Sequence, residues 1–271
     1  MTGFQGINKY DDYTTLGRGG SDTTAVALAS VLHADVCEIF TDVDGVYTAD
    51  PRVVKSARKL KEITYDEMLE LATLGAKVLH NRSVEMAKKY GVKLIVRSSL
   101  TNEEGTVVKE VTKVEKMLIT GVAADKNTAR VSAIGLKDEP GIAFRLFHTL
   151  SKNNINVDII LQSVGHNGTK DISFTVSEDD LQATLDLLEE NKEILTIQEI
   201  TYNKEVAKIS VVGAGMMSNP GVATKMFESL YNSRINIHMI STSEIRITVL
   251  VDERETDRAL NAVHEGFNMS E

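Results

Sequence analysis

The second half of the chain carries one sequence pattern twice, at a spacing of 80 residues. Residues 140–143 are Pro-Gly-Ile-Ala, and residues 220–223 are Pro-Gly-Val-Ala. The same spacing relates three further pairs, which are Phe147 and Phe227, Leu150 and Leu230, and Ser163 and Ser243. Matches this numerous at one spacing indicate an internal duplication, so each copy should fold as one repeat of a single unit.

The two copies share the same order of expected elements. An alternating strand that ends in Gly precedes each Pro-Gly helix start, at 130–135 and 208–213. Another strand follows each helix, at 172–176 and 245–249, and a closing helix comes near 180–190 and 256–264. This order predicts a β-α-β-β-α unit with an extra edge strand, which is a ferredoxin-like α+β fold.

The first part of the chain, to about residue 110, alternates strand and helix patterns. A buried strand is expected at 36–41, a helix that begins after Thr64, a second helix that ends near Tyr90, and a strand at 93–97. This alternation predicts an α/β fold with a mostly parallel sheet. The polar stretch from 101 to 116 is interpreted as a hinge, although 106–111 fits a short strand equally well. The predicted domains are therefore 1–110, 117–200 and 201–271.

Composition limits the classes of partner. Of 271 residues, 42% are hydrophobic and 25% are charged, so the chain has enough apolar material for folded cores. The net charge of −9 argues against nucleic acid or an anionic membrane as the main partner. No apolar run approaches 18 residues, so the expected location is the cytoplasm. No His/Cys cluster has metal-site spacing, so we predict no protein-bound metal.

A glycine-rich stretch from Thr14 to Asp22 offers a candidate anion site. It contains three glycines within four residues, with Arg18 among them, and a strong helix pattern follows. Ser21 or Asp22 is the expected N-cap of that helix. Glycine-rich backbone at a helix start favours bound anions, but a tight turn with a solvated Arg18 explains the residues equally well. The stretch is neither a dinucleotide fingerprint nor a Walker loop.

Polar residues gather after the expected strand at 36–41. Thr41, Asp42, Asp44 and Tyr47 follow its carboxyl end, where open α/β sheets bind ligands. Asp42 or Asp44 could hold a metal or a ribose, and the alternative is an ordinary Asx turn.

Two cations further along are weaker candidates for phosphate contacts. Arg52 follows Pro51, and a lone arginine is more often a surface residue. Lys77 sits at an expected helix start, where a cation is electrostatically misplaced unless it serves an anion.

Each repeat also offers a candidate ligand site where its first helix begins. Asp138 and Gly141 lie at that point of the first copy. Backbone N–H groups there can hold the carboxylate of an amino acid, and a nearby Asp can take its ammonium group. The alternative is a simple helix start with Pro at its first position.

Taken together, these stretches resemble the aspartate kinase family. The residues that carry the resemblance are 14–22, 40–47 with 50–53, 74–80, and the paired Pro-Gly units that end in 240–245. The resemblance implies the carboxyl-terminal part of an amino-acid kinase fold, followed by two ACT domains that bind feedback amino acids. Asn81 stands where the family usually has Pro, which puts no catalytic residue in doubt.

The resemblance also implies roles for individual residues. Arg18 would face the carboxylate of aspartate, and Asp22 its amino group or the polar network beside it. The residues implied at the ATP site are Thr41, Asp42, Tyr47, Arg52 and Lys77. The residues implied around an effector pocket between paired repeats are Asp138, Gly141, Ala143, Gln162, Asn236 and Ile237.

The implied reaction transfers the γ-phosphoryl group of ATP to the β-carboxylate of aspartate, with Mg²⁺ as cofactor. Lysine, threonine or both would be the effector, and a homodimer through the ACT domains is expected. The Lys-Phe-Gly-Gly loop with which the family opens is absent here. One electrostatic contact of that kind is worth about 10²–10³ in rate, so this chain alone should have no useful kinase activity.

Two alternatives belong beside this interpretation. The first is a regulatory, amino-acid-binding subunit that partners a full-length kinase and uses the same repeats. The second is another amino-acid kinase, such as one that acts on glutamate, which the two repeats disfavour.

Overall fold

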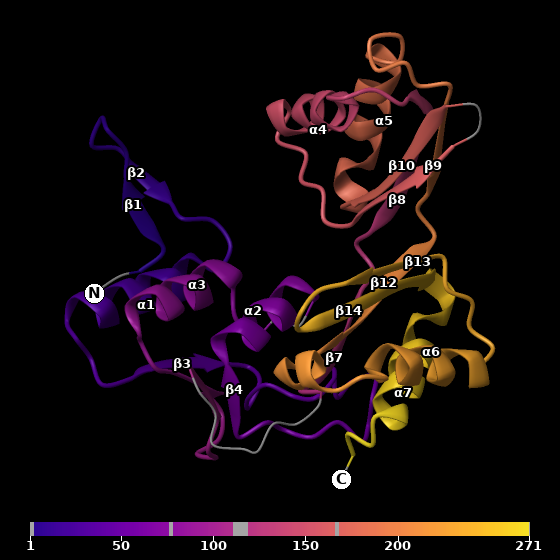
Figure 1. The fold of residues 1–271 in the computed structure, drawn as a ribbon. Helices are drawn as coiled ribbons and strands as arrows, with labels where there is room; N and C mark the ends of the chain where they lie inside the picture. Colours follow the sequence, from indigo (N-terminus) through magenta and orange to yellow (C-terminus); the bar gives the residue numbers. More distant parts are fainter. Residues whose placement is uncertain (1–2, 76–77, 111–118, 166–167, 271) are drawn as a thin grey trace.

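A computed structural model describes residues 3–75, 78–110, 119–165 and 168–270 of the chain. Its described strands form three four-stranded sheets and one two-stranded hairpin. Figure 1 shows the lobe formed by the first part of the chain beside the second repeat, with the first repeat standing apart from the lobe.

The lobe is built on a sheet with the order β3-β5-β6-β4. Strand β3 (Cys37–Thr41) runs parallel to β5 (Leu94–Ser98), which is antiparallel to β6 (Thr106–Lys109), and β6 runs parallel to β4 (Glu62–Thr64). The mostly parallel α/β prediction is confirmed. Residues 106–109 form a strand inside this sheet, so the alternative to the hinge interpretation is correct there.

Three helices accompany the sheet, namely α1 (Gly20–Val31), α2 (Tyr65–Thr73) and α3 (Asn81–Tyr90). Thr64 and Glu67 form a capping box that starts α2, as the sequence predicts. The predicted N-cap of α1 is wrong. That helix begins at Gly20, and Gly19 takes the cap position in a left-handed conformation that needs no side-chain hydrogen bond.

A short hairpin projects from the lobe. It consists of β1 (Gln5–Ile7) and β2 (Tyr13–Thr15), which pair antiparallel and stand away from the helices in Figure 1. Tyr13 is 82% exposed, so the hairpin buries little of its own apolar surface.

The first repeat has the predicted β-α-β-β-α order with an extra edge strand. Its elements are β8 (Ala129–Lys137), α4 (Ile142–Lys152), β9 (Ile160–Val164), β10 (Thr169–Val176), α5 (Leu181–Glu190) and β11 (Glu199–Asn203). The sheet order is β11-β8-β10-β9, with all pairs antiparallel. Phe174 is fully buried beneath the helices and meets the ring of Phe147 edge-on.

The second repeat has the same order. Its elements are β7 (Gly121–Asp125), β12 (Val206–Val212), α6 (Val222–Asn232), β13 (Met239–Thr242), β14 (Arg246–Asp252) and α7 (Thr256–Gly266). Short 3₁₀ turns, η2 (Ala214–Ser218) and η3 (Glu253–Glu255), precede α6 and α7. The sheet order is β13-β14-β12-β7.

The strands at the two ends of the first repeat belong to different sheets. Strand β7 precedes the first repeat in the chain but pairs with β12 of the second repeat, whereas β11 pairs with β8. The second sheet therefore contains a strand from before residue 130, and the hydrogen-bonded sheets do not follow the predicted division at 117–200 and 201–271. Two chain crossings, rather than one, join the repeats.

The lobe and the second repeat share apolar packing. Ala123 and Val212 of the second sheet belong to the lobe's buried cluster, while Ala49 and Val54 of the lobe belong to the cluster beneath the second sheet. These two parts are therefore packed as one body. No helix in the described part of the chain is both long enough and apolar enough to cross a bilayer.

Candidate functional site

The glycine-rich loop is held from outside by α3. Arg18 is exposed between Gly17 and Gly19, whose φ angles are +76° and +71°. A Cβ on Gly19 would lie 2.3 Å from the Cβ of His80, so only glycine fits there. The guanidinium of Arg82 donates a hydrogen bond of 3.1 Å to the carbonyl of Leu16. The amino end of α3 therefore sets the path of the loop that presents Arg18.

Asp22 lies in the first turn of α1, four residues after Arg18, and is partly buried. Its carboxylate accepts a hydrogen bond of 3.3 Å from the hydroxyl of Ser21. Burial raises the pKa of the Cys37 thiol on β3, and the charge of Asp22 raises it further. The loop, the helix start and the edge strand β3 therefore meet at one place.

The segment after β3 brings Asp42 near Arg52. The hydroxyl of Thr41 donates to the carboxylate of Asp42 over 3.0 Å. Arg52 is exposed, and its guanidinium pairs with Asp50 at 2.7 Å. Hydrogen bonds from Asp50 raise the pKa of Arg52, with a smaller contribution from the charge of Asp42. A phosphate would therefore compete with Asp50 for Arg52.

Tyr47 belongs to a separate polar network. Its hydroxyl donates to Asp44 over 3.0 Å, and Lys59 pairs with Asp44 at 3.2 Å and with Glu103 at 3.0 Å. Burial acts to raise the pKa of Asp44, but hydrogen bonds from Lys59 and Tyr47 outweigh it and lower the pKa. Asp44 is thus already neutralised by a cation, which makes it a poor metal ligand.

Two further observations bear on the predicted ATP site. Lys77 lies outside the described residues, so its place in the site stays a prediction. Within the described ranges, no three His, Cys, Asp or Glu side chains gather closely enough to hold a metal ion.

The helix start of the first repeat is occupied by its own ion pairs. Asp138 is exposed and pairs with Lys170 at 2.8 Å. Glu139 pairs with Arg145 and Lys137 beside it. A ligand's ammonium group would have to displace Lys170 to reach Asp138.

The other predicted residues of the first repeat lie around the same helix. Gly141 precedes α4 with a φ of +94°, and Ala143 packs against the core below. Gln162 is exposed on the edge strand β9.

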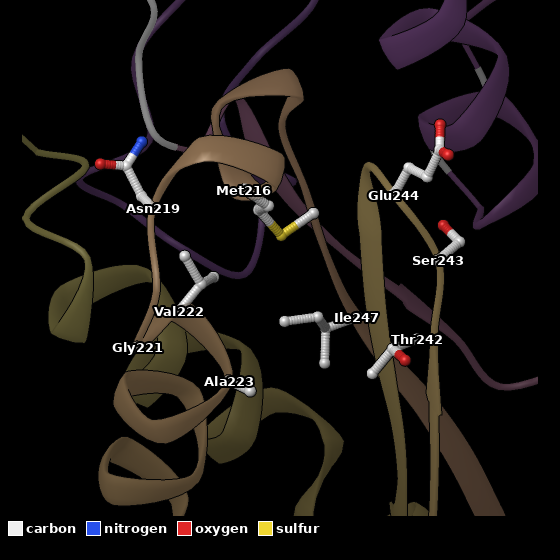
Figure 2. A pocket seen from close by; sticks show the side chains of 9 residues that line it. All are labelled: Met216, Asn219, Gly221, Val222, Ala223, Thr242, Ser243, Glu244 and Ile247. Carbon is white, nitrogen blue, oxygen red and sulfur yellow. The ribbon is translucent and has the colours of Figure 1, made fainter.

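The second repeat has an open pocket at the equivalent place. The pocket has a volume of about 410 Å³ and lies between η2, the amino end of α6 and the hairpin of β13 and β14 (Figure 2). Its lining residues are Met216, Asn219, Gly221, Val222, Ala223, Thr242, Ser243, Glu244 and Ile247. Figure 2 shows Met216 and Ile247 on facing walls, with Glu244 at the rim.

The pocket coincides with the effector residues predicted in the first repeat, displaced by one repeat. Gly221, Ala223 and Thr242 stand 80 residues after Gly141, Ala143 and Gln162. The two residues that we predicted from the second repeat, Asn236 and Ile237, follow the carboxyl end of α6 and do not line the pocket.

Three lining residues escaped the sequence analysis, namely Met216, Glu244 and Ile247. Applying the 80-residue spacing to the predicted residues would have located this pocket.

The pocket combines the groups that an amino acid needs. Gly221 adopts a left-handed conformation at the start of α6, and no side chain caps that helix. Its first backbone N–H groups therefore face the pocket region without a side-chain acceptor, which favours a carboxylate. Glu244 supplies a negative charge at the rim, and Met216 and Ile247 supply apolar surface.

Comparison with known proteins assigns both halves of the chain. The sequence model of the amino acid kinase family matches residues 1–98, and that of an ACT domain matches residues 131–191 and 209–267. The aspartokinase of Helicobacter pylori (strain ATCC 700392 / 26695) is 47% identical over 276 residues, which cover 100% of this chain and 68% of that protein. The chain belongs to the aspartate kinase family. The aspartokinase of Bacillus sp. (strain MGA3) is 52% identical over the full chain.

Solved structures of the aspartate kinase family agree with this assignment. E. coli aspartokinase III in complex with aspartate and ADP superimposes with a TM-score of 0.83 at 30% identity, covering 97% of this chain and 59% of that one. Its complex with lysine and aspartate gives 0.76 at 31% identity. The regulatory subunit of the Thermus thermophilus aspartate kinase gives 0.52 at 39% identity, covering 55% of this chain and 99% of that subunit.

The chain spans 66% of the length of the Bacillus aspartokinase. The predictions of an amino-acid kinase fold with ACT domains and of membership in the aspartate kinase family are confirmed.

Proposed function

We propose that this chain supplies the carboxyl-terminal part of an aspartate kinase that transfers the γ-phosphoryl group of ATP to the β-carboxylate of L-aspartate. The observation that carries the proposal is a glycine-rich lobe and two ACT repeats joined in the order of the aspartokinases that match the whole chain. The E. coli enzyme crystallised with aspartate and ADP supports the two reactants.

The glycine-rich loop is the proposed aspartate site. Arg18 binds the α-carboxylate of aspartate through its planar guanidinium, and Asp22 faces the amino group. The exposure of Arg18 and its place in a loop fixed by His80 and Arg82 support this role. The attacking β-carboxylate is ionised at neutral pH, so the reaction needs no general base.

The ATP site is proposed along the segment after β3 and the start of α3. Thr41, Asp42 and Tyr47 would bind the nucleoside side, and Arg52 and Lys77 the phosphates. Bound Mg²⁺ neutralises phosphate charge in phosphoryl transfer generally. The described residues hold no metal cluster, so we assign no Mg²⁺ ligand here and derive no step through the ion.

We infer that this chain alone transfers phosphoryl groups too slowly to be useful. Its sequence has no Lys-Phe-Gly-Gly loop, and each missing phosphate contact costs about 10²–10³ in rate.

The ACT repeats are proposed to bind lysine, threonine or both as feedback effectors. The pocket at α6 and its counterpart around Asp138, Gly141, Ala143 and Gln162 support this role, as does the lysine complex of the E. coli enzyme. Asn236 and Ile237 would reach a ligand only from a neighbouring repeat, which fits a pocket formed between paired repeats.

A homodimer through the ACT sheets is proposed on the same ground. Every residue of the edge strand β9 is exposed, including Val164 at 89%, and an exposed apolar edge pairs readily with another strand. ATP and free amino acids are cytoplasmic metabolites, so we propose a cytoplasmic location.

A second candidate function is a regulatory subunit that partners a complete kinase. The Thermus thermophilus regulatory subunit favours it, because nearly that whole subunit aligns with the repeats of this chain.

Titration calorimetry of the chain with lysine, threonine and ATP separates the two functions, together with an assay of aspartate-dependent ADP release. Effector binding without ATP binding favours the regulatory subunit. Effector binding together with ATP binding favours the kinase part, and measurable aspartate-dependent turnover by the chain alone would refute the inferred inactivity.

A further inference from the structure

Both walls of the pocket in the second repeat are attached to one helix of the lobe. The wall formed by η2 is held by Glu67, and the wall formed by β14 is held by Glu70. These two carboxylates are three residues apart on α2, so they lie on one face of that helix. The pocket and the lobe therefore meet along α2.

Glu67 is a buried carboxylate at this junction, with only 6% of its surface exposed. One oxygen accepts hydrogen bonds from the backbone and hydroxyl of Thr64. The other accepts from the hydroxyl of Thr120 over 2.6 Å and from the backbone N–H of Ala214, the first residue of η2, over 3.2 Å. A buried charge needs such partners, so a shift of η2 would be felt by α2.

Glu70 forms the second attachment. Its carboxylate lies 3.1 Å from the guanidinium of Arg246, the first residue of β14, and both side chains are largely buried. Arg246 is the residue before Ile247, which lines the pocket. The other guanidinium nitrogen of Arg246 is 3.9 Å from Asp158 of the first repeat. A displacement of this wall would therefore move both partners of Arg246.

The far end of α2 reaches the glycine-rich loop. Asn81, the first residue of α3, donates a hydrogen bond of 2.8 Å to the hydroxyl of Thr73, the last residue of α2. Asn81 is flanked by His80 and Arg82, which fix Gly19 and Leu16. A continuous set of contacts thus runs from the pocket, along α2, to the loop that carries Arg18.

We propose that Glu67 and Glu70 couple ligand occupancy of the second-repeat pocket to the glycine-rich loop, with α2 as the moving element. A ligand that changes the separation of η2 and β14 pulls on two carboxylates of one helix, and that helix repositions the start of α3. The identity of the ligand as an amino acid rests on the proposed function. The attachment of both walls to α2 does not.

The test is amide hydrogen exchange of the chain with the substitution Glu70→Gln, which removes the charge and keeps the side-chain size. Asp66→Asn is the matched control, because Asp66 lies on the same helix but pairs with Lys88 inside the lobe. Without any ligand, E70Q should speed exchange of residues 242–247 by about 5-fold or more, the lower end of typical coupling between sites. D66N should leave those residues unchanged.

The same measurement is then made with L-lysine and with L-threonine. In the unaltered chain and in D66N, a bound amino acid should slow exchange in the pocket walls, in α2 and in residues 16–20. In E70Q it should slow exchange in the pocket walls, while the effect on residues 16–20 is lost.

Unchanged exchange of residues 242–247 in ligand-free E70Q overturns the coupling, as does a ligand effect on the loop that survives in E70Q. Failure of both amino acids to bind, seen by calorimetry, overturns the proposed sensing role. The ligand-free comparison still decides the coupling in that case.

Discussion

The hydroxyl of Thr48, in the lobe, lies 2.9 Å from Nε2 of His264, in the last helix. Both side chains are fully buried, and Nδ1 of His264 has no hydrogen-bond partner among the described residues. Burial lowers the pKa of His264, and the charge of Arg58 lowers it further. The contact between the lobe and the second repeat therefore depends on a neutral histidine.

Acid should weaken this contact. The unfolded chain takes up a proton on His264 near its ordinary pKa of about 6.5, before the folded chain does. The stability from neutral His264 is thus present above that pH and is lost as pH falls below it, at up to about 1.4 kcal/mol per pH unit. Urea unfolding between pH 7.5 and about pH 5 measures the slope. H264Q should flatten it, and H148Q, at an exposed histidine, should not. Equal slopes in H264Q and the unaltered chain would contradict the prediction.

The glycine-rich loop offers a matched pair of substitutions. Gly17 and Gly19 have nearly the same positive φ, but a Cβ meets nothing within 4 Å at Gly17 and collides with His80 at Gly19. G17A should cost only the backbone strain, about 1–2 kcal/mol. G19A should cost a further 1–3 kcal/mol or so because of the collision. Equal costs by urea unfolding would show that His80 does not constrain the loop.

Lys208 should stabilise the junction of the two repeats. Its ammonium group is 2.7 Å from Asp158 of the first repeat and 3.3 Å from Asp125 on β7, and its side chain is 9% exposed. K208M leaves two carboxylates close together without a cation, so it should cost about 1–3 kcal/mol. K192M, which breaks the more exposed pair with Glu189, should change stability by less than about 0.5 kcal/mol. A K208M chain as stable as K192M would count against this bridge.

Cys37 should react slowly with alkylating reagents. The thiol is buried on β3, and burial with the nearby charge of Asp22 raises its pKa. Because the thiolate is the reactive form, labelling with iodoacetamide at pH 8 should be at least about 10-fold slower in the folded chain than in urea. Equal rates would mean that α1 and β3 do not enclose the thiol.

The repeated architecture could be predicted because its signal is local. The Pro-Gly helix starts, the alternating strands and the capping box at Thr64 each follow from a few neighbouring residues, and the spacing of 80 residues places them twice. The cap of α1 could not be predicted in the same way. Ser21 and Asp22 are good caps, but the positive φ of Gly19 starts the helix earlier.

Long-range pairing was beyond the sequence. Nothing in Gly121–Asp125 indicates that it crosses the first repeat to pair with β12, because short apolar strands carry no mark of their partner. Glu67 and Glu70 are typical exposed residues of a helix in sequence. Their contacts with Ala214 and Arg246 arise only when residues more than 140 positions apart are packed together.

The most direct test of the account is the melting temperature of the chain in saturating lysine and threonine, with and without the substitution Ala223→Leu. A ligand at 100 times its dissociation constant adds about 2.7 kcal/mol of stability. For a chain of this size we therefore expect a rise of about 5 °C or more with at least one amino acid. A223L, which fills the pocket, should abolish the rise. A melting temperature that neither amino acid changes, or a rise that A223L leaves intact, would contradict the assignment of this pocket as the sensor.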